Sequence, residues 1–228
     1  MVEQKKPDMS SLKSSAYMLL VFDWDGTLID SEGKIIFAFH AACDDLAVSR
    51  RSAEDIRNVI GLGLPIAIRS IFPECDSQQM MGKIQEQYRY HFAAAASAEL
   101  FPGVRETLVK LREAGFLMAV ATGKSRRGLN DDLLSTGLWE MFDATRCADE
   151  APSKPHPQML QEICEELQVA AKNTLMIGDT EHDLKMAQNA GVDAVAVTYG
   201  AQSQDYLQQW KPRIFCDSLP ELITWLVR

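Results

Sequence analysis

The sequence lacks the features that define several classes of protein. Its five cysteines form no C-x-x-C pair, and their odd number argues against a disulfide framework. No apolar run is long enough to span a bilayer, and the first fifteen residues contain no apolar segment typical of a secretory signal. Lysine and arginine form no strong cluster, and the net charge is -9. We therefore expect reduced thiols, a cytoplasmic location, and neither nucleic acid nor a membrane as partner.

The remaining composition is that of an ordinary globular protein. The chain has 228 residues, of which 46% are apolar and 24% charged. A chain of this size can bury a full core, either as one large domain or as a core with an insertion. We expect residues 1–16, which are largely polar, to form a flexible tail.

Short apolar runs alternate with helical patterns over most of the chain. Strands are predicted over residues 17–22, 116–121, 174–177 and 194–197, and helices over 104–114, 126–135, 158–167 and 184–190. Gly115 and Gly191 fall where helix C-caps belong. This alternation predicts an α/β fold with a Rossmannoid core built on a parallel sheet.

The stretch from about Ser31 to Phe101 differs, because it has helical apolar spacing and no convincing strand. Helices are predicted over 35–46, 53–59 and 78–96. Asp30 and Ser31 can cap a helix, and a Phe-Pro-Gly turn at 101–103 restarts the α/β pattern. We therefore predict a core of residues 17–31 and 101–228, with an all-helical cap of residues 32–100 inserted after the first strand.

Polar residues follow two of the apolar runs where acids could gather around a cation. Asp23 and Asp25, in the string Asp-Trp-Asp-Gly-Thr-Leu, leave the first strand on the same side and would repel each other without a cation or proton between them. Asp179 and Asp183 follow the third run four positions apart, and their oxygens suit Mg²⁺. Ordinary acidic turns and helix caps are the alternatives.

Two further strings could bind the phosphate of a substrate. Thr122 and Gly123 precede a helix, whose N-terminus favours an anion, although a plain helix cap is the alternative. Lys154 stands before Pro155, which favours extended geometry and would let the lysine point into the cleft. A lone lysine is otherwise a solvated surface group.

Taken together, the four strings closely resemble the motifs of the haloacid dehalogenase superfamily, in the family's order. Its phosphatase branch carries D-x-D-G-T-L-x-D-S, which this chain matches from Asp23 to Ser31. The resemblance covers residues 17–228. It implies that Asp23 is the nucleophile that forms an aspartyl-phosphate, and that Asp25 is the general acid and base.

The same resemblance assigns the phosphate and metal ligands. Thr122, Gly123 and Lys154 would bind the phosphate. Mg²⁺ would be held by Asp23, the backbone carbonyl of Asp25 and the carboxylate of Asp179, with Asp183 in support.

The insertion contains a glycine-rich break that resembles the cap loop of phosphoglycolate phosphatases. Gly61 and Gly63 in this loop could bring backbone amides to the substrate, although a plain turn between helices is the alternative. Arg126 and Arg127 are candidates for binding a second anionic group of the substrate. We expect His182 to lie on the surface.

These features imply a Mg²⁺-dependent phosphatase that acts on a small phosphorylated metabolite, either phosphoglycolate-like or a sugar phosphate. A phosphosugar mutase of the β-phosphoglucomutase type shares the motifs and the cap, and is the alternative enzyme. A non-catalytic module that binds phosphate or another protein is the alternative of a different class.

Overall fold

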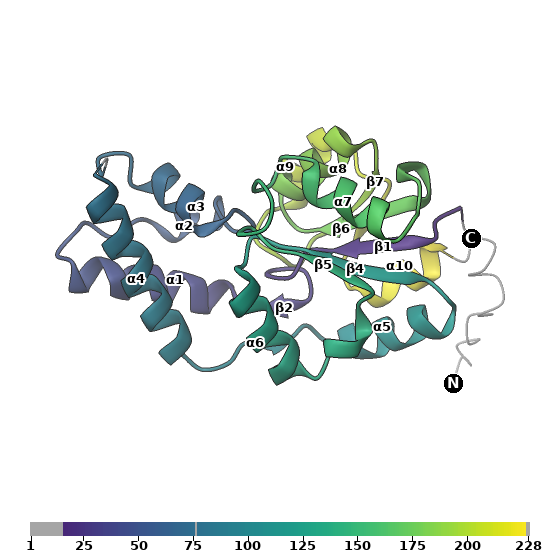
Figure 1. Ribbon diagram of the computed structural model, residues 1–228, viewed down its shortest axis with the longest axis horizontal. Helices are drawn as coiled ribbons and strands as arrows, with labels where there is room; N and C mark the ends of the chain where they lie inside the picture. Colours follow the sequence, from purple (N-terminus) through teal and green to yellow (C-terminus); the bar gives the residue numbers. More distant parts are fainter. Residues whose placement is uncertain (1–15, 76, 227–228) are drawn as a thin grey trace.

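The computed structural model describes residues 16–75 and 77–226, which form an α/β core and a helical insert (Figure 1). The predicted tail over 1–16 lies outside these residues, apart from residue 16, and stays a prediction. All five cysteines are free, as expected. No helix in the described ranges combines the length and the apolar character needed to cross a membrane.

One parallel sheet of six strands forms the centre of the core, in the order β5-β4-β1-β6-β7-β8. The strands are β1 (Leu19–Phe22), β4 (Leu117–Ala121), β5 (Ala144–Arg146), β6 (Thr174–Gly178), β7 (Asp193–Val197) and β8 (Phe215–Cys216). β1 lies between β4 and β6, and all of its residues are fully buried. A strand covered on both faces needs a continuous apolar run, and this run made β1 predictable from the sequence. The prediction of an α/β fold is confirmed.

Two of these strands were not predicted. β5 has the sequence Ala-Thr-Arg, and β8 has only two residues. Both lie at edges of the sheet and are partly exposed. Edge strands are often short and polar, so neither shows a recognisable apolar run.

Helices cover both faces of the sheet (Figure 1). α5 (Val104–Glu113), α6 (Arg126–Thr136) and α10 (Pro220–Leu226) share one apolar cluster with the sheet, and α7 (Gln158–Glu166) and α8 (Glu181–Ala190) share another. Shorter elements are α9 (Gln204–Leu207) and the 3₁₀ turns η2 (Trp139–Met141), η3 (Ala171–Asn173) and η4 (Gln208–Trp210). The sheet is therefore covered on both sides, as parallel sheets require.

The start of α8 differs from its prediction by three residues. The helix begins at Glu181, after the N-cap Thr180, rather than at residue 184. Asp183 accepts hydrogen bonds from the backbone N and the hydroxyl of Thr180, at 3.1 and 2.7 Å, which stabilises this first turn. The turn is polar, so the apolar pattern did not reveal it. Gly191 ends the helix with φ +69°, as predicted.

The insert has its own apolar core. Its helices in the described residues are α1 (Glu32–Asp45), α2 (Ala53–Arg57), α3 (Leu64–Ile71) and α4 (Gln78–Ala94). A separate cluster of buried residues, including Phe39, Ile56 and Ile68, joins them. α3 was not predicted, because the glycine-containing stretch 59–65, which ends at Pro65, was interpreted as a break between helices. A proline in the first turn of a helix loses no hydrogen bond, so α3 can begin at Leu64.

A short antiparallel pair, β2 (Ile29–Asp30) and β3 (Glu99–Leu100), joins the insert to the core. The sequence predicted no strand here, because two residues are too few to show a pattern. The pair stands next to the predicted borders at 31/32 and 100/101. The division into core and cap stays a prediction, which this pairing supports.

Candidate active site

Several of the predicted site residues lie at the carboxyl ends of neighbouring strands. Asp23 follows β1, Thr122 follows β4 and Asp179 follows β6. Because β1 lies between β4 and β6, these ends meet at one edge of the sheet. Lys154, from the segment between β5 and α7, reaches the same place with a fully buried side chain. The fold thus gathers residues from four separate segments.

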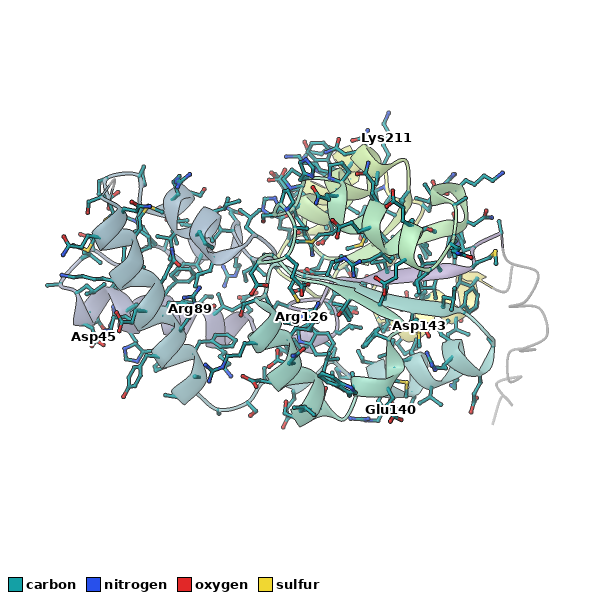
Figure 2. All side chains as sticks on the ribbon, in the orientation of Figure 1. Asp45, Arg89, Arg126, Glu140, Asp143 and Lys211 are labelled. Carbon is teal, nitrogen blue, oxygen red and sulfur yellow. The ribbon has the colours of Figure 1, made fainter. Side chains whose placement is uncertain are left out.

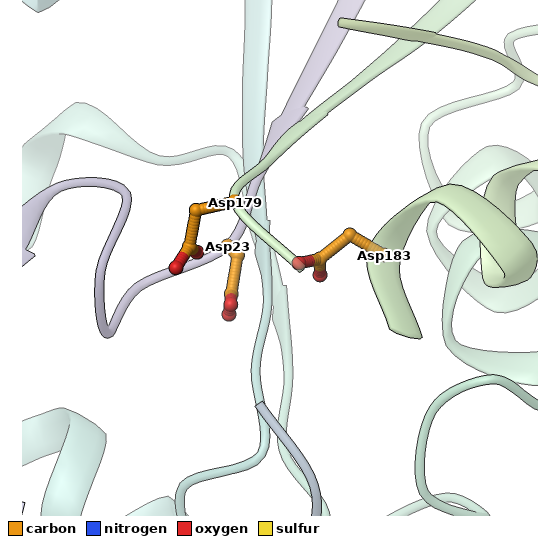
Figure 3. A group of neighbouring side chains, drawn as sticks. All are labelled: Asp23, Asp179 and Asp183. Carbon is orange, nitrogen blue, oxygen red and sulfur yellow. The ribbon is translucent and has the colours of Figure 1, made fainter. Parts of the chain in front are cut away.

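Asp23, Asp179 and Asp183 form a compact group, which we name the acid cluster (Figure 3). One carboxylate oxygen from each lies within 4.8 Å of the other two. All three residues are fully buried. Asp183, predicted only to support the metal site, therefore belongs to the same compact group as the other two acids.

Hydrogen bonds occupy most of the oxygens in the acid cluster. The donors belong to Trp24, Thr27, Lys154, Thr180 and Ala201. Oδ2 of Asp23 differs, because it is buried and has no hydrogen-bond partner among the described residues. An unpaired buried carboxylate oxygen is costly, so a ligand or a reacting atom belongs beside it.

Lys154 is the cation that pairs with this cluster. Its Nζ lies 2.6 Å from Oδ1 of Asp23 and 2.7 Å from Oδ1 of Asp183. Burial alone would disfavour its charge, but the nearby charges of Asp183 and Asp23 outweigh burial and raise the pKa of Lys154. The lysine therefore stays charged at neutral pH.

One ammonium group does not balance three carboxylates. Burial, together with the charge of Asp183, raises the pKa of Asp179 to about 7. Burial also raises the pKa of Asp23 well above its usual value, although Lys154 opposes this. The acid cluster offers only oxygen atoms as metal ligands, and Oδ2 of Asp23 has no other partner. Because the cluster also has surplus negative charge, its residues fit a hard divalent cation.

Two glycines allow the backbone to approach Asp179. Gly26, with φ +82°, would place a Cβ 2.2 Å from Oδ2 of Asp179, and Gly200 would place one 2.4 Å from the same atom. Neither position has room for a side chain while Asp179 keeps its place. Gly26 was part of the first motif, whereas Gly200, far along the chain, was not predicted.

The carboxylate of Asp25 lies outside the acid cluster. Its Oδ1 accepts hydrogen bonds from Ser31 Oγ at 2.6 Å and from Lys124 Nζ at 3.2 Å. Ser31 and Lys124 therefore hold the carboxylate of Asp25, and its predicted convergence with Asp23 on one pocket stays a prediction. A contribution to a metal through its backbone carbonyl stays a prediction.

The cap loop contacts the core at Gly123. A Cβ on Gly123 would lie 2.5 Å from the carbonyl oxygen of Gly61, and a Cβ on Gly61 would lie 3.8 Å from Oδ2 of Asp23. The backbone N–H of Gly63 donates to Ser153 Oγ at 2.8 Å. Both glycines of the predicted loop therefore touch the core beside the site.

A cavity of about 730 Å³ extends from the cap loop between α1, α4 and α6. Arg127 lines it, but its side chain is 93% exposed. Arg126 lies on α6 (Figure 2), and its guanidinium bonds to Glu150 and Thr145. Arg126 therefore does not serve the cavity as the sequence suggested.

Three other residues complete the description of the predicted site. Thr122 is fully buried beside Gly123. His182 Nε2 lies 3.0 Å from the carbonyl oxygen of Asn58, so it joins core and cap at the surface. Trp24 packs in the core against Phe142.

Sequence reasoning missed a network around Lys124. Its Nζ lies 2.9 Å from Oδ2 of Asp132, which also accepts from the indole N–H of Trp24 at 2.9 Å. The lysine stands directly after Gly123 in the second motif, so its position was a possible signal. Asp132 lies on α6 without any local pattern to distinguish it.

The family of this chain follows from comparison with known proteins. Residues 20–197 match the family described as haloacid dehalogenase-like hydrolase. The chain belongs to the haloacid dehalogenase-like hydrolase family, which confirms the resemblance predicted from the four motifs.

Individual relatives are similar over nearly their whole length. The chain is 37% identical over 210 residues to "Probable phosphatase IndB" of Dickeya dadantii, covering 90% of this chain and 91% of that protein. It is 32% identical over 214 residues to a phosphoglycolate phosphatase of Vibrio parahaemolyticus, covering 90% and 94%. The crystal structure of a predicted phosphoglycolate phosphatase from Haemophilus somnus superposes with a TM-score of 0.82 at 25% identity, covering 92% and 98%.

Proposed function

We propose that this protein is a Mg²⁺-dependent phosphatase that hydrolyses a small phosphomonoester through an aspartyl-phosphate on Asp23. The observation that carries the proposal is the free, buried Oδ2 of Asp23, whose other oxygen, Oδ1, pairs with Lys154 and whose side chain belongs to the acid cluster. The relatives bear the names phosphatase and phosphoglycolate phosphatase, which supports this class of substrate.

The first step transfers the phosphoryl group to the enzyme. An oxygen of Asp23 attacks phosphorus, and the bond from phosphorus to the leaving oxygen breaks. Asp25 gives its proton to that oxygen, so that an alcohol departs. Lys154, the backbone N–H of Gly123 and the hydroxyl of Thr122 offset the negative charge of the phosphoryl oxygens.

The second step releases phosphate. Asp25, now a carboxylate, takes a proton from water, and the water oxygen attacks phosphorus. The bond between phosphorus and the Asp23 oxygen breaks, which regenerates both acids for the next turnover. Because Ser31 and Lys124 both donate to Oδ1 of Asp25, this contact orients the carboxyl group and leaves Oδ2 for proton transfer.

The acid cluster is the place for the divalent metal. Asp23 and Asp179 would hold it together with the backbone carbonyl of Asp25, and Asp183 would support it. The bound ion would supply positive charge that reduces repulsion between the anionic nucleophile and the anionic substrate. The cap loop at Gly61 would exclude water from the site during the first step.

Phosphate release by the purified protein with Mg²⁺ tests this proposal, using p-nitrophenyl phosphate and a panel of phosphorylated metabolites. Asp23→Asn should lower kcat by about 10⁴-fold or more, because it removes the attacking carboxylate. Asp205→Asn, an exposed acid on α9, is the matched control and should keep wild-type activity. An Asp23→Asn variant as active as this control would contradict the proposal.

The same assay separates the alternatives. If a hexose 1-phosphate were converted to the 6-phosphate without free phosphate, the protein would be a mutase. If the wild type neither released phosphate from any substrate nor converted the hexose 1-phosphate, the non-catalytic alternative would stand.

A further inference from the structure

Two lysines approach one aromatic ring inside the cavity between cap and core. Nζ of Lys34, on α1, lies 4.3 Å from the centroid of the Phe92 ring, and Nζ of Lys124 lies 4.7 Å from the same centroid. Phe92 belongs to α4, so the cap supplies the ring and one lysine, whereas the core supplies the other. Asp25 and both lysines line the cavity.

The charge of Lys124 is already balanced. Its Nζ lies 3.2 Å from Asp25 and 2.9 Å from Asp132, and only 8% of its side chain is exposed. The indole of Trp24 holds Asp132 in place. Lys124 therefore orients Asp25, and its ammonium group is already paired with two carboxylates, so it is a poor partner for a further anion.

Lys34 differs in this respect. It forms no ion pair within 4.0 Å with a carboxylate in the described part of the chain, although its side chain is half-buried. Burial lowers the pKa of Lys34, Asp132 and Asp25 offset only part of this effect, and Lys124 adds repulsion. A nearby anion would therefore stabilise this ammonium group.

We propose that Lys34 binds a second anionic group of the substrate, either a carboxylate or a further phosphoryl group, on the leaving-group side of the reaction centre. The inference rests on the proposed phosphatase function, in which Asp25 protonates the leaving oxygen. Because Lys34 and Asp25 line one cavity, the remainder of the leaving group would extend toward the cap lysine. Phe92 covers this lysine and reduces its contact with water.

The position of this group differs from the one that the sequence suggested. Arg126 was a candidate for the second anion, but Glu150 and Thr145 occupy its guanidinium. Lys34 instead belongs to the cap. Selection by charge would therefore require the cap to be closed over the substrate.

Substrates matched in size but not in charge test the assignment. We would compare kcat/KM for 2-phosphoglycolate and pyrophosphate, which carry a second anionic group, with that for ethyl phosphate, which does not. Lys34→Gln should lower kcat/KM by about 10- to 100-fold for whichever anionic substrate the wild type prefers, as expected for a lost charged hydrogen bond. For ethyl phosphate the change should stay within about twofold.

Two further variants separate charge from structure. Lys34→Arg keeps the positive charge and should retain most of the preference for substrates with a second anionic group. Lys83→Gln removes an exposed lysine of α4 and should leave kcat/KM unchanged for both kinds of substrate. An equal loss of kcat/KM in Lys34→Gln for substrates with and without a second anionic group, or no loss at all, would overturn the inference.

A binding experiment keeps this inference distinct from the proposed function. Isothermal titration calorimetry with phosphonoacetate and ethylphosphonate, both with Mg²⁺, needs no turnover. Lys34→Gln should weaken the binding of phosphonoacetate by about 10-fold or more and leave the affinity for ethylphosphonate unchanged. Equal affinities in the variant and the wild type would refute the role of Lys34, even if phosphatase activity were established. Absence of turnover in the wild type would refute the function, while the binding data would still decide the role of Lys34.

Discussion

Replacing Gly123 by alanine tests whether the cap loop must contact the core during turnover. The added Cβ would lie 2.5 Å from the carbonyl oxygen of Gly61 and 2.6 Å from that of Leu62. Ordinary van der Waals contacts of a Cβ begin at about 3.4 Å. Both obstacles are backbone atoms, so no side-chain rotation can relieve the overlap. The cap loop must therefore move outward by roughly 1 Å.

The structure indicates how large the effect should be. Gly61 is also the cap residue whose Cβ, if present, would lie 3.8 Å from Oδ2 of Asp23, so its displacement opens the site at the nucleophile. A misplacement of about 1 Å can cost about 100-fold in rate. We expect kcat/KM of Gly123→Ala to fall by about 10- to 100-fold. The overlap lies between core and cap, so each should still fold.

Initial rates of phosphate release, combined with small-angle X-ray scattering, provide the assay. The variant should show a lower rate and a larger radius of gyration. Gly82→Ala is the matched control, because no atom lies within 4 Å of the added Cβ in α4. It should keep its activity and gain up to about 1 kcal/mol in the free energy of unfolding.

Two results would refute this reasoning. Activity of Gly123→Ala within about twofold of the wild type would show that the contact is not needed for turnover. A large loss of activity with an unchanged cap position would assign the role of Gly123 to phosphate binding alone.

Three further predictions concern the metal, one arginine and one tyrosine. Mg²⁺ at about 100 times its Kd should raise the free energy of unfolding by about 2.7 kcal/mol, because the acid cluster lacks positive charge; a Tm that a chelator and Mg²⁺ leave unchanged would contradict a metal site there. Arg126→Ala should keep kcat/KM within about twofold, because the guanidinium bonds to Glu150 and does not face the cavity. A larger loss in the rate assay would make Arg126 a substrate ligand again. Burial and a hydrogen bond to Asp193 raise the pKa of Tyr17 from 10.0 to about 12, so its stabilising effect is present below pH 10 and lost as the pH rises toward 12. Urea denaturation at pH 9 and pH 11 should show a smaller decline for Tyr17→Phe than for the wild type, and equal declines would contradict this.

Local sequence was sufficient for the strand ends. Asp23, Thr122 and Asp179 each follow a buried apolar run directly, and parallel strands bring their carboxyl ends to one edge. These positions depend on residues a few places apart, so the pattern could be recognised without coordinates. The two edge strands and the polar first turn of α8 were missed, because they carry no apolar periodicity.

By itself, the amino-acid sequence determined the family, the α/β core with its helical insert, and the list of acids and cations available for chemistry. Only the tertiary structure decided how those charges pair. Lys124 meets Asp25 across 99 positions, and Lys34 and Lys124 both approach the Phe92 ring. The contact between Lys124 and Asp25 depends on the sheet, which places β1 beside β4, whereas the two approaches to Phe92 depend on how the insert packs on the core.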